Sequence, residues 1–255
     1  MCGRYAATAN PDELILEFEV QTDRTAEPSR SILVNPQHPP AGTPDPDFGP
    51  TKQGPVVLTR HPRRPASSPE AATAAPAPVR QLRLLTWGLV PSWSKDVKGA
   101  ARMINARAET LRQRPAYVKA FAARRCLVPA AGWYEWQLTE QSGPSGRPRK
   151  QPHLIRRVDG STVAMAGIYE FWRDPTVAPE DPLAWLSTYA VVTTAAEPAL
   201  SHIHDRQPLV LEASHWQRWL DPDAGIPDVI DLVQPRTEDS GRFEALPVLA
   251  PGAPW

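Results

Sequence analysis

The stretch CLVPAAGWYEWQL, residues 126–138, carries a strong strand signal. Its two parts, Cys126–Pro129 and Gly132–Leu138, have the apolar and aromatic composition of β-strands. Because side chains alternate across a strand, Trp133 and Glu135 are expected to share one face. A carboxylate among indole rings is poorly solvated, which raises its pKa and suits it to general acid catalysis. A Glu on an edge strand without a chemical role is the other interpretation.

Short strand patterns continue on both sides of this stretch. Strands are predicted at residues 56–59, 79–87, 153–158, 162–171, 185–194 and 208–211. The dipeptide Asp159-Gly160 favours a hairpin between the third and fourth of these strands. Helices are predicted from residue 10, where Asn, Pro and Glu indicate a capping box, and at 107–114, 116–123, 197–202 and 215–220. Locally connected strands with a few short helices predict an α+β fold on a mostly antiparallel sheet or barrel.

Proline is concentrated in one part of the chain. Thirteen of the 31 prolines fall in residues 28–78, which excludes regular structure there apart from the strand at 56–59. The part at about 60–78 is predicted to be a disordered surface loop. No linker separates two strand sets of comparable size, so residues 1–255 are predicted to form one domain.

Charge and cysteine content exclude several classes of protein. The formal net charge is zero, and no apolar run reaches the ~18–20 residues of a membrane span. The charged start lacks the apolar stretch of a signal peptide, so a cytoplasmic location is predicted. Two cysteines are too few for a disulfide framework, and no CxxC or HxxxH spacing indicates zinc. No metal and no cofactor are therefore expected.

Basic residues are concentrated in a second stretch. Residues 95–125 hold nine Lys or Arg against two acidic residues, whereas residues 171–255 hold five Arg against thirteen acidic residues. Basic, amide and aromatic side chains together can hold a phosphate backbone and stack bases. A solvated basic face is the simpler interpretation.

The chain begins MCGRYA, with one of its two cysteines at position 2. If Met1 is removed, Cys2 carries an α-amine and a thiol on adjacent carbons, with unperturbed pKa values of about 7.7–8.0 and about 8.5. A useful fraction of each group is then nucleophilic near neutral pH. An unimportant cysteine at a disordered chain end is the alternative.

Two further segments place chemically active side chains close together. Residues 103–109 contain the amide of Asn105, the guanidinium of Arg107 and a carboxylate within five positions. Asn105 as the N-cap of a helix is the structural alternative. In the segment HIHDR, His202 and His204 stand at i and i+2, which would suit a metal site, but no third ligand is evident.

Five motifs, in this order, resemble the SOS response-associated peptidase (SRAP) family. The resemblance implies a single antiparallel-sheet domain that senses and shields abasic sites in single-stranded DNA during the DNA damage (SOS) response. It implies covalent attachment to that DNA, a lyase activity, and a peptidase activity seen chiefly as self-removal of Met1. The protein would act as a monomer in the cytoplasm, associated with the nucleoid when bound to DNA. The motifs, which cover residues 1 to about 211, are MCGRYA, Trp87-Gly88, Asn105-Ala106-Arg107-Ala108-Glu109, Gly132-Trp133-Tyr134-Glu135-Trp136 and Ile203-His204-Asp205-Arg206.

The same resemblance implies roles for individual residues. Cys2 is the crosslinking nucleophile, and three side chains surround the reacting sugar: Asn105, Glu135 and His204. The residues implied to contact DNA are Arg4 and Arg107 at phosphates, Trp93 against bases, Thr194 near the backbone, and Asp47 and Pro50 in the loop ahead of the early strand.

Two positions depart from the family pattern. Residues 46–51, PDFGPT, match the family's aromatic-Asn-Val-Ala-Pro-Thr stretch, so Asp47 places a negative charge beside DNA where asparagine is expected. Ser94 stands where a second aromatic residue is expected after Trp93, which removes one stacking surface. The proline-rich run at 60–78 is longer than the family core requires.

The aminothiol of a processed Cys2 suits the chemistry that the resemblance implies. An abasic deoxyribose opens to an aldehyde, with which the α-amine forms an imine before the thiolate closes a five-membered thiazolidine. Opening the sugar ring requires proton transfers, for which Glu135 and His204 are candidates, and Asn105 can orient the sugar.

Two other functions fit parts of the sequence. Glutamine amidotransferases with an N-terminal cysteine also begin Met-Cys-Gly, and there Cys2 would attack a side-chain amide with its α-amine as base. No further stretch resembles theirs. A non-covalent single-stranded DNA-binding module would depend on Arg4, Arg107 and salt concentration but not on Cys2.

Overall fold

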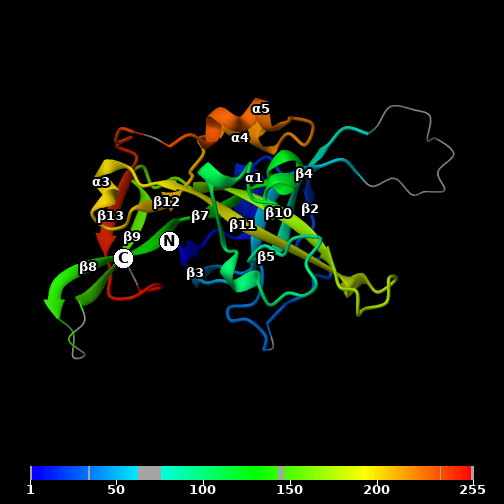
Figure 1. Cartoon of the computed structure of the whole chain (residues 1–255), viewed down its shortest axis with the longest axis horizontal. Helices are drawn as coiled ribbons and strands as arrows, with labels where there is room; N and C mark the ends of the chain where they lie inside the picture. The colour runs from blue at the N-terminus through cyan, green and yellow to red at the C-terminus, as the bar shows by residue number, and fades with distance from the viewer. Residues whose placement is uncertain are drawn as a thin grey trace.

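The computed structural model describes residues 2–33, 35–62, 76–142, 146, 148–235 and 237–253. Its strands form two sheets, and short helices lie along the outside of the larger one (Figure 1). The expected α+β class is confirmed. No helix in the described ranges is long and apolar enough to cross a membrane.

The strands and helices are short and follow one another closely along the chain. The strands are β1 (Tyr5–Ala7), β2 (Thr22–Asp23), β3 (Asp45–Phe48), β4 (Gln53–Arg60), β5 (Val79–Trp87), β6 (Asn105–Arg107), β7 (Arg125–Ala130), β8 (Gly132–Ser142), β9 (Pro148–Arg157), β10 (Val163–Arg173), β11 (Trp185–Ala195), β12 (Arg206–Pro208) and β13 (Phe243–Pro247). The α-helices are α1 (Pro11–Glu17), α2 (Val118–Ala123), α3 (Pro198–Ser201), α4 (Ala213–Leu220) and α5 (Ile226–Val229). The 3-10 helices are η1 (Ala100–Arg102), η2 (Ala108–Thr110), η3 (Pro182–Ala184) and η4 (Ile230–Val233).

Five strands of the larger sheet close into a barrel. The order β11-β10-β7-β4-β5 is antiparallel throughout, and β5 then pairs again with β11, in parallel, through Thr86↔Thr188 and Trp87↔Tyr189. Strands β2, β6 and β12 extend this sheet, the first two also in parallel. The sheet is therefore mostly antiparallel, as predicted, with three parallel pairings that the local strand pattern did not indicate.

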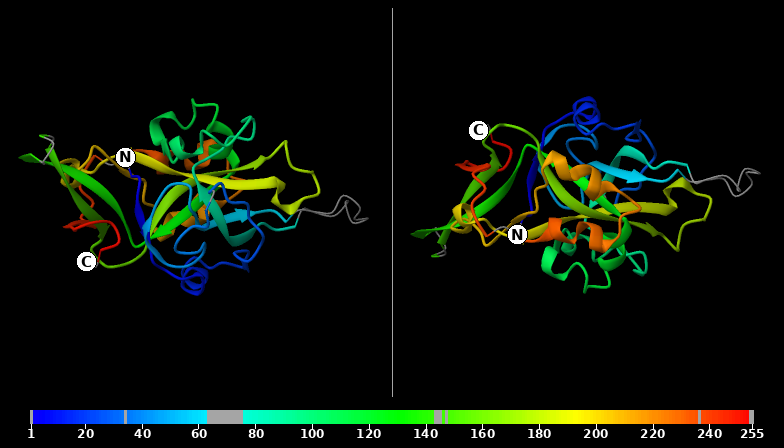
Figure 2. Two further views of the ribbon diagram at one scale, coloured as in Figure 1. Left: turned by 90° about the horizontal axis from the view of Figure 1, so that it is seen from below. Right: turned by 90° about the horizontal axis from the view of Figure 1, so that it is seen from above.

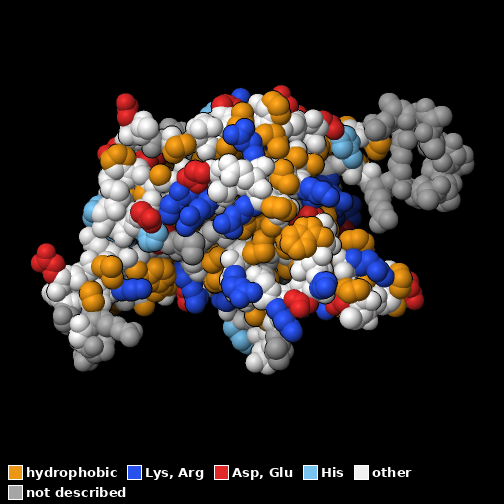
Figure 3. Space-filling model, in the orientation of Figure 1, with side chains coloured by type: hydrophobic (Ala, Val, Ile, Leu, Met, Phe, Trp, Pro, Cys, Tyr) orange, Lys and Arg blue, Asp and Glu red, His pale blue; other side chains and the backbone are white. Residues whose placement is uncertain are grey.

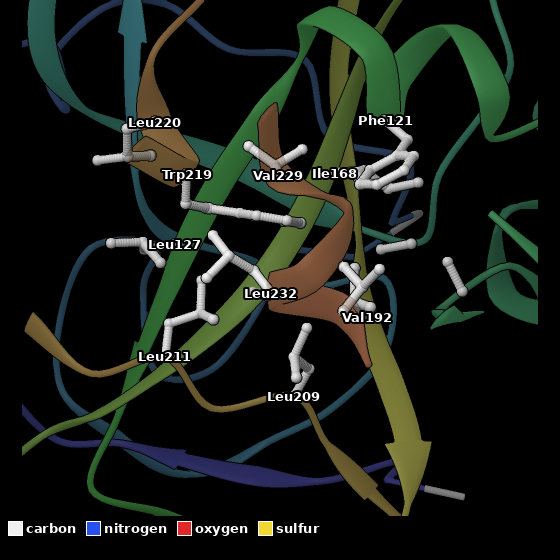
Figure 4. Packing of buried hydrophobic residues seen from close by; sticks show 14 of the residues in the cluster. Phe121, Leu127, Ile168, Val192, Leu209, Leu211, Trp219, Leu220, Val229 and Leu232 are labelled. Carbon is white, nitrogen blue, oxygen red and sulfur yellow. The ribbon is translucent and has the colours of Figure 1, made fainter. Parts of the chain in front are cut away.

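Side chains alternate between the inside and the outside of the barrel. On β4, Val56 and Leu58 belong to one buried cluster and Val57 to another. The Val57 cluster includes residues of α1, α2 and α4, so it lies outside the barrel; Figure 4 shows Phe121 and Trp219 packing there. The other cluster draws on all five barrel strands and fills the interior. Burial on both faces explains the apolar runs within the barrel strands, such as residues 56–58 of β4.

The smaller sheet, in the order β13-β9-β8-β1-β3, is antiparallel. Strand β1 lies between β8 and β3, with Tyr5 opposite both Trp133 and Phe48. Both Tyr5 and Trp133 belong to the cluster that fills the barrel. The first residues of the chain are thereby held against one end of the barrel.

The predicted hairpin between residues 153–158 and 162–171 is wrong. The turn itself exists, with Gly160 at φ +72° and its N–H donating to the Arg157 carbonyl at 3.1 Å. However, β9 pairs with β8 and β13, whereas β10 pairs with β7 and β11, so the chain changes sheets at this turn. An Asp-Gly signal specifies the turn conformation but not the partners of the flanking strands.

The predicted helix at 107–114 is also wrong. Residues 105–107 form β6, which pairs in parallel with β11, and a single turn of 3-10 helix follows. Asn105 is therefore a strand residue and not a helix cap. The strand predicted at 208–211 is shifted to 206–208, with one isolated bridge at Val210.

The remaining predicted elements are found close to their expected positions. At α1, Asn10 and Glu13 form both bonds of the capping box at 3.0 Å each, which confirms the helix start. A strand that the proline content did not predict, β3, lies at 45–48, at the sheet edge where proline is tolerated. Most of the loop predicted at 60–78 lies outside the described residues.

Candidate functional site

Asn105 fixes the main chain of Cys2. Its side-chain Nδ2 donates a hydrogen bond of 2.7 Å to the Cys2 carbonyl oxygen. Strand pairing explains the direction of this side chain: Ala106 belongs to the outer cluster, so its neighbour Asn105 points the other way, toward the start of the chain. The hydroxyl of Tyr117 donates to the Asn105 carbonyl at 3.2 Å and secures β6.

Cys2 and Glu135 lie against each other in the buried end of the barrel. The main chain ahead of β1 runs beside β8, because the Tyr134 N–H donates to the Arg4 carbonyl at 2.9 Å. Burial, followed by the charge of Glu135, raises the pKa of the Cys2 thiol. Burial also raises the pKa of Glu135 to about 7. The expectation that Glu135 shares a poorly solvated face with Trp133 is confirmed, since both side chains are fully buried.

His204 contacts Asp205, whose charge acts on Glu135. Its Nδ1 lies 3.0 Å from Asp205 Oδ1 and accepts the Arg206 N–H, also at 3.0 Å. Burial lowers the pKa of His204, and the charge of Asp205 contributes to the raised pKa of Glu135. The structure therefore brings Cys2, Asn105 and Glu135 together, and the segment His204-Asp205 lies within electrostatic reach of Glu135.

Arg4 is paired with Asp47. The guanidinium Nη1 lies 3.2 Å from Asp47 Oδ1, and both side chains are partly exposed. The guanidinium passes so close to Gly49 that a Cβ there would lie 2.7 Å from Nη1. Pro50 directly follows Gly49, so Arg4, Asp47 and Pro50 form one surface beside the start of the chain. Asp47, which was expected to place a negative charge beside DNA, is thus neutralised by Arg4, which was expected to bind phosphate.

Arg107 is exposed two residues after Asn105, on the same side of β6. No hydrogen bond or ion pair with another described residue holds its guanidinium. The nearby carboxylate of Glu109 does not pair with it, because Glu109 accepts two bonds from Arg206, at 2.6 and 3.0 Å. Thr194 lies nearby on β11 but is buried, opposite Gln207 of β12.

Trp93 stands apart from the Cys2 group, on a turn after β5. Its side chain is 64% exposed. The turn is closed by the Ser94 N–H bonding the Pro91 carbonyl at 2.8 Å, and Trp172 Nε1 donates to the Ser94 carbonyl at 2.7 Å. No ring contact or hydrogen bond joins Trp93 to Cys2 among the described residues. Lys and Arg side chains gather across the middle of this face of the molecule (Figure 3).

The Trp87-Gly88 motif has a structural reason. Gly88 adopts φ +134°, which L side chains rarely adopt, and a Cβ there would lie 2.6 Å from the Ala100 carbonyl oxygen. Its neighbour Trp87 lies inside the barrel and donates from Nε1 to the Ile104 carbonyl at 2.8 Å. This bond places the segment that leads into Asn105.

Sequence reasoning missed two residues of the site. His153 lies opposite Glu135 across the β8–β9 pair, and burial lowers its pKa. Arg206 belongs to one of the five motifs but was given no role. Its guanidinium pairs with Glu109 and donates to the Thr193 carbonyl at 2.7 Å, and its main-chain N–H donates to His204 Nδ1. The register of the β8–β9 hairpin would have indicated His153. Within the described residues, no group of three or more His, Cys, Asp and Glu could hold a metal ion.

The fold and this site define a class of mostly antiparallel β-barrel proteins with a cysteine at position 2 enclosed by an amide, a carboxyl and an imidazole. The profile of the family described as SOS response associated peptidase (SRAP) matches residues 1–250. The chain belongs to this family.

Several curated relatives carry names that state a function. "Abasic site processing protein YoqW" of Bacillus subtilis is 36% identical over 160 residues, which are 62% of this chain and 66% of that protein. "Abasic site processing protein HMCES" of Gallus gallus is 32% identical over 193 residues, 68% of this chain and 52% of that protein. The matched part therefore spans between half and two thirds of these relatives.

A crystal structure of a protein from Bacteroides thetaiotaomicron has the same fold. Its TM-score is 0.68 at 22% identity, covering 96% of this chain and 90% of that one. A likeness at this level of identity concerns the fold alone.

Proposed function

We propose that this protein processes abasic sites in single-stranded DNA by a covalent crosslink through Cys2, after removal of Met1. The observation that carries the proposal is the group formed by Cys2, Asn105 and Glu135, in a chain whose relatives are named for abasic site processing. In this group an amide holds the Cys2 main chain, and a carboxyl of raised pKa is close enough for its charge to act on the Cys2 thiol.

An unpartnered buried polar atom supports a ligand at this position. Asn105 Oδ1 is buried and has no hydrogen-bond partner among the described residues. Buried polar atoms are nearly always satisfied in a folded protein, so exceptions at a site suggest that a ligand completes them. A sugar hydroxyl can donate to the Asn105 oxygen.

The covalent chemistry requires both groups of Cys2. The α-amine adds to the aldehyde carbon of the opened sugar, and loss of water gives an imine. The thiol sulfur then bonds to the same carbon while the imine nitrogen gains a proton, which closes a thiazolidine. No oxidant or reductant is needed. Because an imine alone is readily hydrolysed, the sulfur makes the product persistent.

Glu135 and His204 are suited to the accompanying proton transfers. A carboxyl group with a pKa of about 7 is partly protonated at neutral pH, so it can donate to the ring oxygen of the sugar or accept from its hydroxyl. Burial lowers the pKa of His204, which favours a neutral ring that can accept a proton. Such general acid–base catalysis typically contributes ~10²–10⁴-fold in rate.

The strand would be held by exposed basic side chains beside the Cys2 group and by Trp93 on the turn after β5. Arg107 is exposed and has no partner among the described residues, so binding a phosphate breaks no ion pair. Trp93, 64% exposed, offers a stacking surface. Arg4 must leave Asp47 before it can contribute fully.

Removal of Met1 is the step that would give the family its peptidase name. Water adds across the Met1–Cys2 peptide bond, and the Cys2 amine becomes free. In the unprocessed chain the Cys2 thiol is buried and its pKa is raised, so the protein is a poor nucleophile before this step. Intact mass spectrometry of purified protein reports whether Met1 has been lost.

The proposal is tested by incubating the protein with single-stranded DNA that contains one abasic site, followed by a denaturing gel. A heat-stable band of retarded DNA, absent with undamaged DNA, is expected. Cut DNA on the same gel would reveal lyase activity. Absence of the adduct with fully processed protein would overturn the proposal, and glutamine hydrolysis by that protein would favour an amidotransferase instead.

A further inference from the structure

The barrel has a second mouth, at the end of its strands remote from Cys2. Inward-facing positions continue along each strand beyond the apolar interior: on β4, Val56 and Leu58 lead to Arg60, and on β5, Leu85 leads to Arg83. A pocket of about 730 Å³ opens there and is lined by Arg60, Arg83 and residues of β2, β10 and β11. The mouths of barrels are common ligand sites.

This pocket is separate from the Cys2 group. Trp185, which lines it, begins β11, whereas Val191, the pairing partner of Asn105, lies six residues further along the strand. At about 3.3 Å per residue this places the two about 20 Å apart. The N-terminus and the connection between β10 and β11 lie toward opposite ends of the molecule in Figure 2.

The pocket carries an excess of positive charge. Three arginines line it, and Glu27 is the one carboxylate among the lining residues. Glu27 is shared, with Oε1 2.8 Å from Arg24 Nη1 and Oε2 3.1 Å from Arg83 Nη1. The formal charge of these four side chains is therefore +2. A small anion entering the pocket would neutralise this excess in a setting partly shielded from water.

Arg60 is the arginine most available to such an anion. Its guanidinium stacks on the Phe171 ring, with Cζ 4.5 Å from the ring centroid. No carboxylate of a described residue pairs with it. Stacking fixes the guanidinium plane and leaves its N–H edge free for two parallel bonds, the geometry that suits phosphate oxygens.

Trp185 supplies a flat apolar surface at the rim of the same pocket. Its side chain is 46% exposed although it belongs to a barrel strand. An exposed indole can stack a nucleobase, and Ser187 and Gln81 line the space between it and the arginines. Arginine and tryptophan side chains therefore line the same pocket.

From these contacts we infer that the second mouth binds a nucleoside phosphate, with its phosphate at Arg60 and Arg83 and its base at Trp185. The ligand is either a free nucleotide or one unit of a DNA strand, and the chemistry of recognition is the same for both. The inference is independent of the crosslinking proposed for Cys2.

Calorimetric titration of the full chain tests this inference with three probes: a deoxynucleoside monophosphate, the same nucleoside without phosphate, and inorganic phosphate. The nucleotide is expected to bind, and each of the other probes at least about ten-fold more weakly, because each lacks one of the two contacts. Equal affinity for inorganic phosphate, or no binding of the nucleotide, would overturn the inference.

Variants locate the binding. Arg60→Gln and Trp185→Ala are each expected to weaken nucleotide binding about ten-fold, whereas Arg149→Gln, which removes an exposed arginine of the other sheet, should leave it unchanged. Trp185 is half exposed, so its variant tests the site even if Arg60→Gln lowers stability. Unchanged affinity in both pocket variants would contradict the assignment.

The source of the nucleotide is decided by competition. If undamaged single-stranded DNA displaces the nucleotide from the wild type, the second mouth accepts a unit of a strand. If it does not, the site takes free nucleotides. Both results support recognition of a nucleoside phosphate, provided that the binding followed in the competition is the binding that Arg60→Gln weakens.

Discussion

The side-chain amide of Asn105 bonds the carbonyl oxygen of Cys2 at 2.7 Å, across 103 positions of sequence. Asn105 is itself fixed by the pairing of β6 with β11. The bond therefore couples the position of the first residues of the chain to the barrel. In the proposed function the nitrogen of Cys2 is a reacting atom, and this side chain is the one that bonds the Cys2 main chain directly among the described residues.

Replacing Asn105 by Ala should slow crosslinking about ten-fold or more, because both the bond to Cys2 and the contact to the sugar are lost. The rate of adduct formation on abasic single strands measures this. Tyr117→Phe is the control: it removes only the hydroxyl that bonds the Asn105 carbonyl, and it should change the rate much less. An Asn105→Ala variant that crosslinks as fast as Tyr117→Phe would contradict the role of the amide.

Glu135→Gln should slow crosslinking ten-fold or more, within the usual range for loss of a general acid or base, while DNA affinity stays within a few-fold. Because the pKa of this carboxyl is raised to about 7 in the chain that retains Met1, the wild-type rate should show an inflection in this region beside that of the Cys2 α-amine, and the variant should lack the carboxyl's inflection. Single-turnover rates over a pH series provide the measurement. If the variant keeps both inflections, the one ascribed to the carboxyl belongs to another group.

The raised pKa of Glu135 also predicts how stability depends on pH. Between its ordinary value of 4.5 and about 7, the unfolded chain has lost the proton that the folded chain retains. Stability should therefore fall as pH rises through this window and stay level above it, by at most about 3 kcal/mol. Chemical denaturation of protein that retains Met1 should show this fall in the wild type and not in Glu135→Gln.

Replacing Asp47 by Asn should tighten binding of single-stranded DNA a few-fold, because it removes a repelling charge and frees Arg4 from a partly exposed ion pair. Arg4→Ala should then flatten the salt dependence of affinity more in the Asp47→Asn background than in the wild type, by up to about 0.7 per phosphate contact. Affinities of the four proteins over a salt series measure this coupling. Weaker binding by Asp47→Asn would show that this loop lies elsewhere relative to DNA.

His204→Asn should leave the fold intact, because the Asn oxygen can accept the Arg206 N–H as Nδ1 does. The variant cannot transfer a proton, so formation or reversal of the adduct should slow about ten-fold or more. Time courses of adduct gain and loss measure both steps. If neither rate changes, His204 supports the segment around Asp205 and has no part in the proton transfers.

The sequence predicted most strands but not the way they close. The strand at residues 79–87 was found where expected, because Leu82 and Leu84 alternate with Arg83 as side chains do along a strand. The parallel pairings of β11 with β5 and β6 could not be predicted, since local patterns carry no information on partners distant in sequence. For the same reason an Asp-Gly turn was taken as a hairpin although β9 and β10 belong to different sheets.

The motifs indicated candidate site residues but not their geometry. They named Cys2, Asn105, Glu135 and His204, and the structure places the first three side by side. The motif around Asn105 was expected as a helix because Ala, Arg and Glu favour helices, but tertiary pairing with β11 overrides that preference. The pairing of Arg4 with Asp47 and of Arg206 with Glu109 joins distant segments and needed the structure.

The central claim is that the α-amine of Cys2, and not only its thiol, reacts with the abasic site. It is tested most directly by a protein with a non-cleavable tag ahead of Met1, compared with processed protein whose loss of Met1 is confirmed by intact mass. The tagged protein keeps the thiol but has no free Cys2 amine. The account predicts that it forms no heat-stable adduct with abasic single-stranded DNA, and that Cys2→Ala forms at most a reversible one. Equal crosslinking by the tagged and processed proteins would contradict the aminothiol mechanism and make Cys2 an ordinary thiol nucleophile.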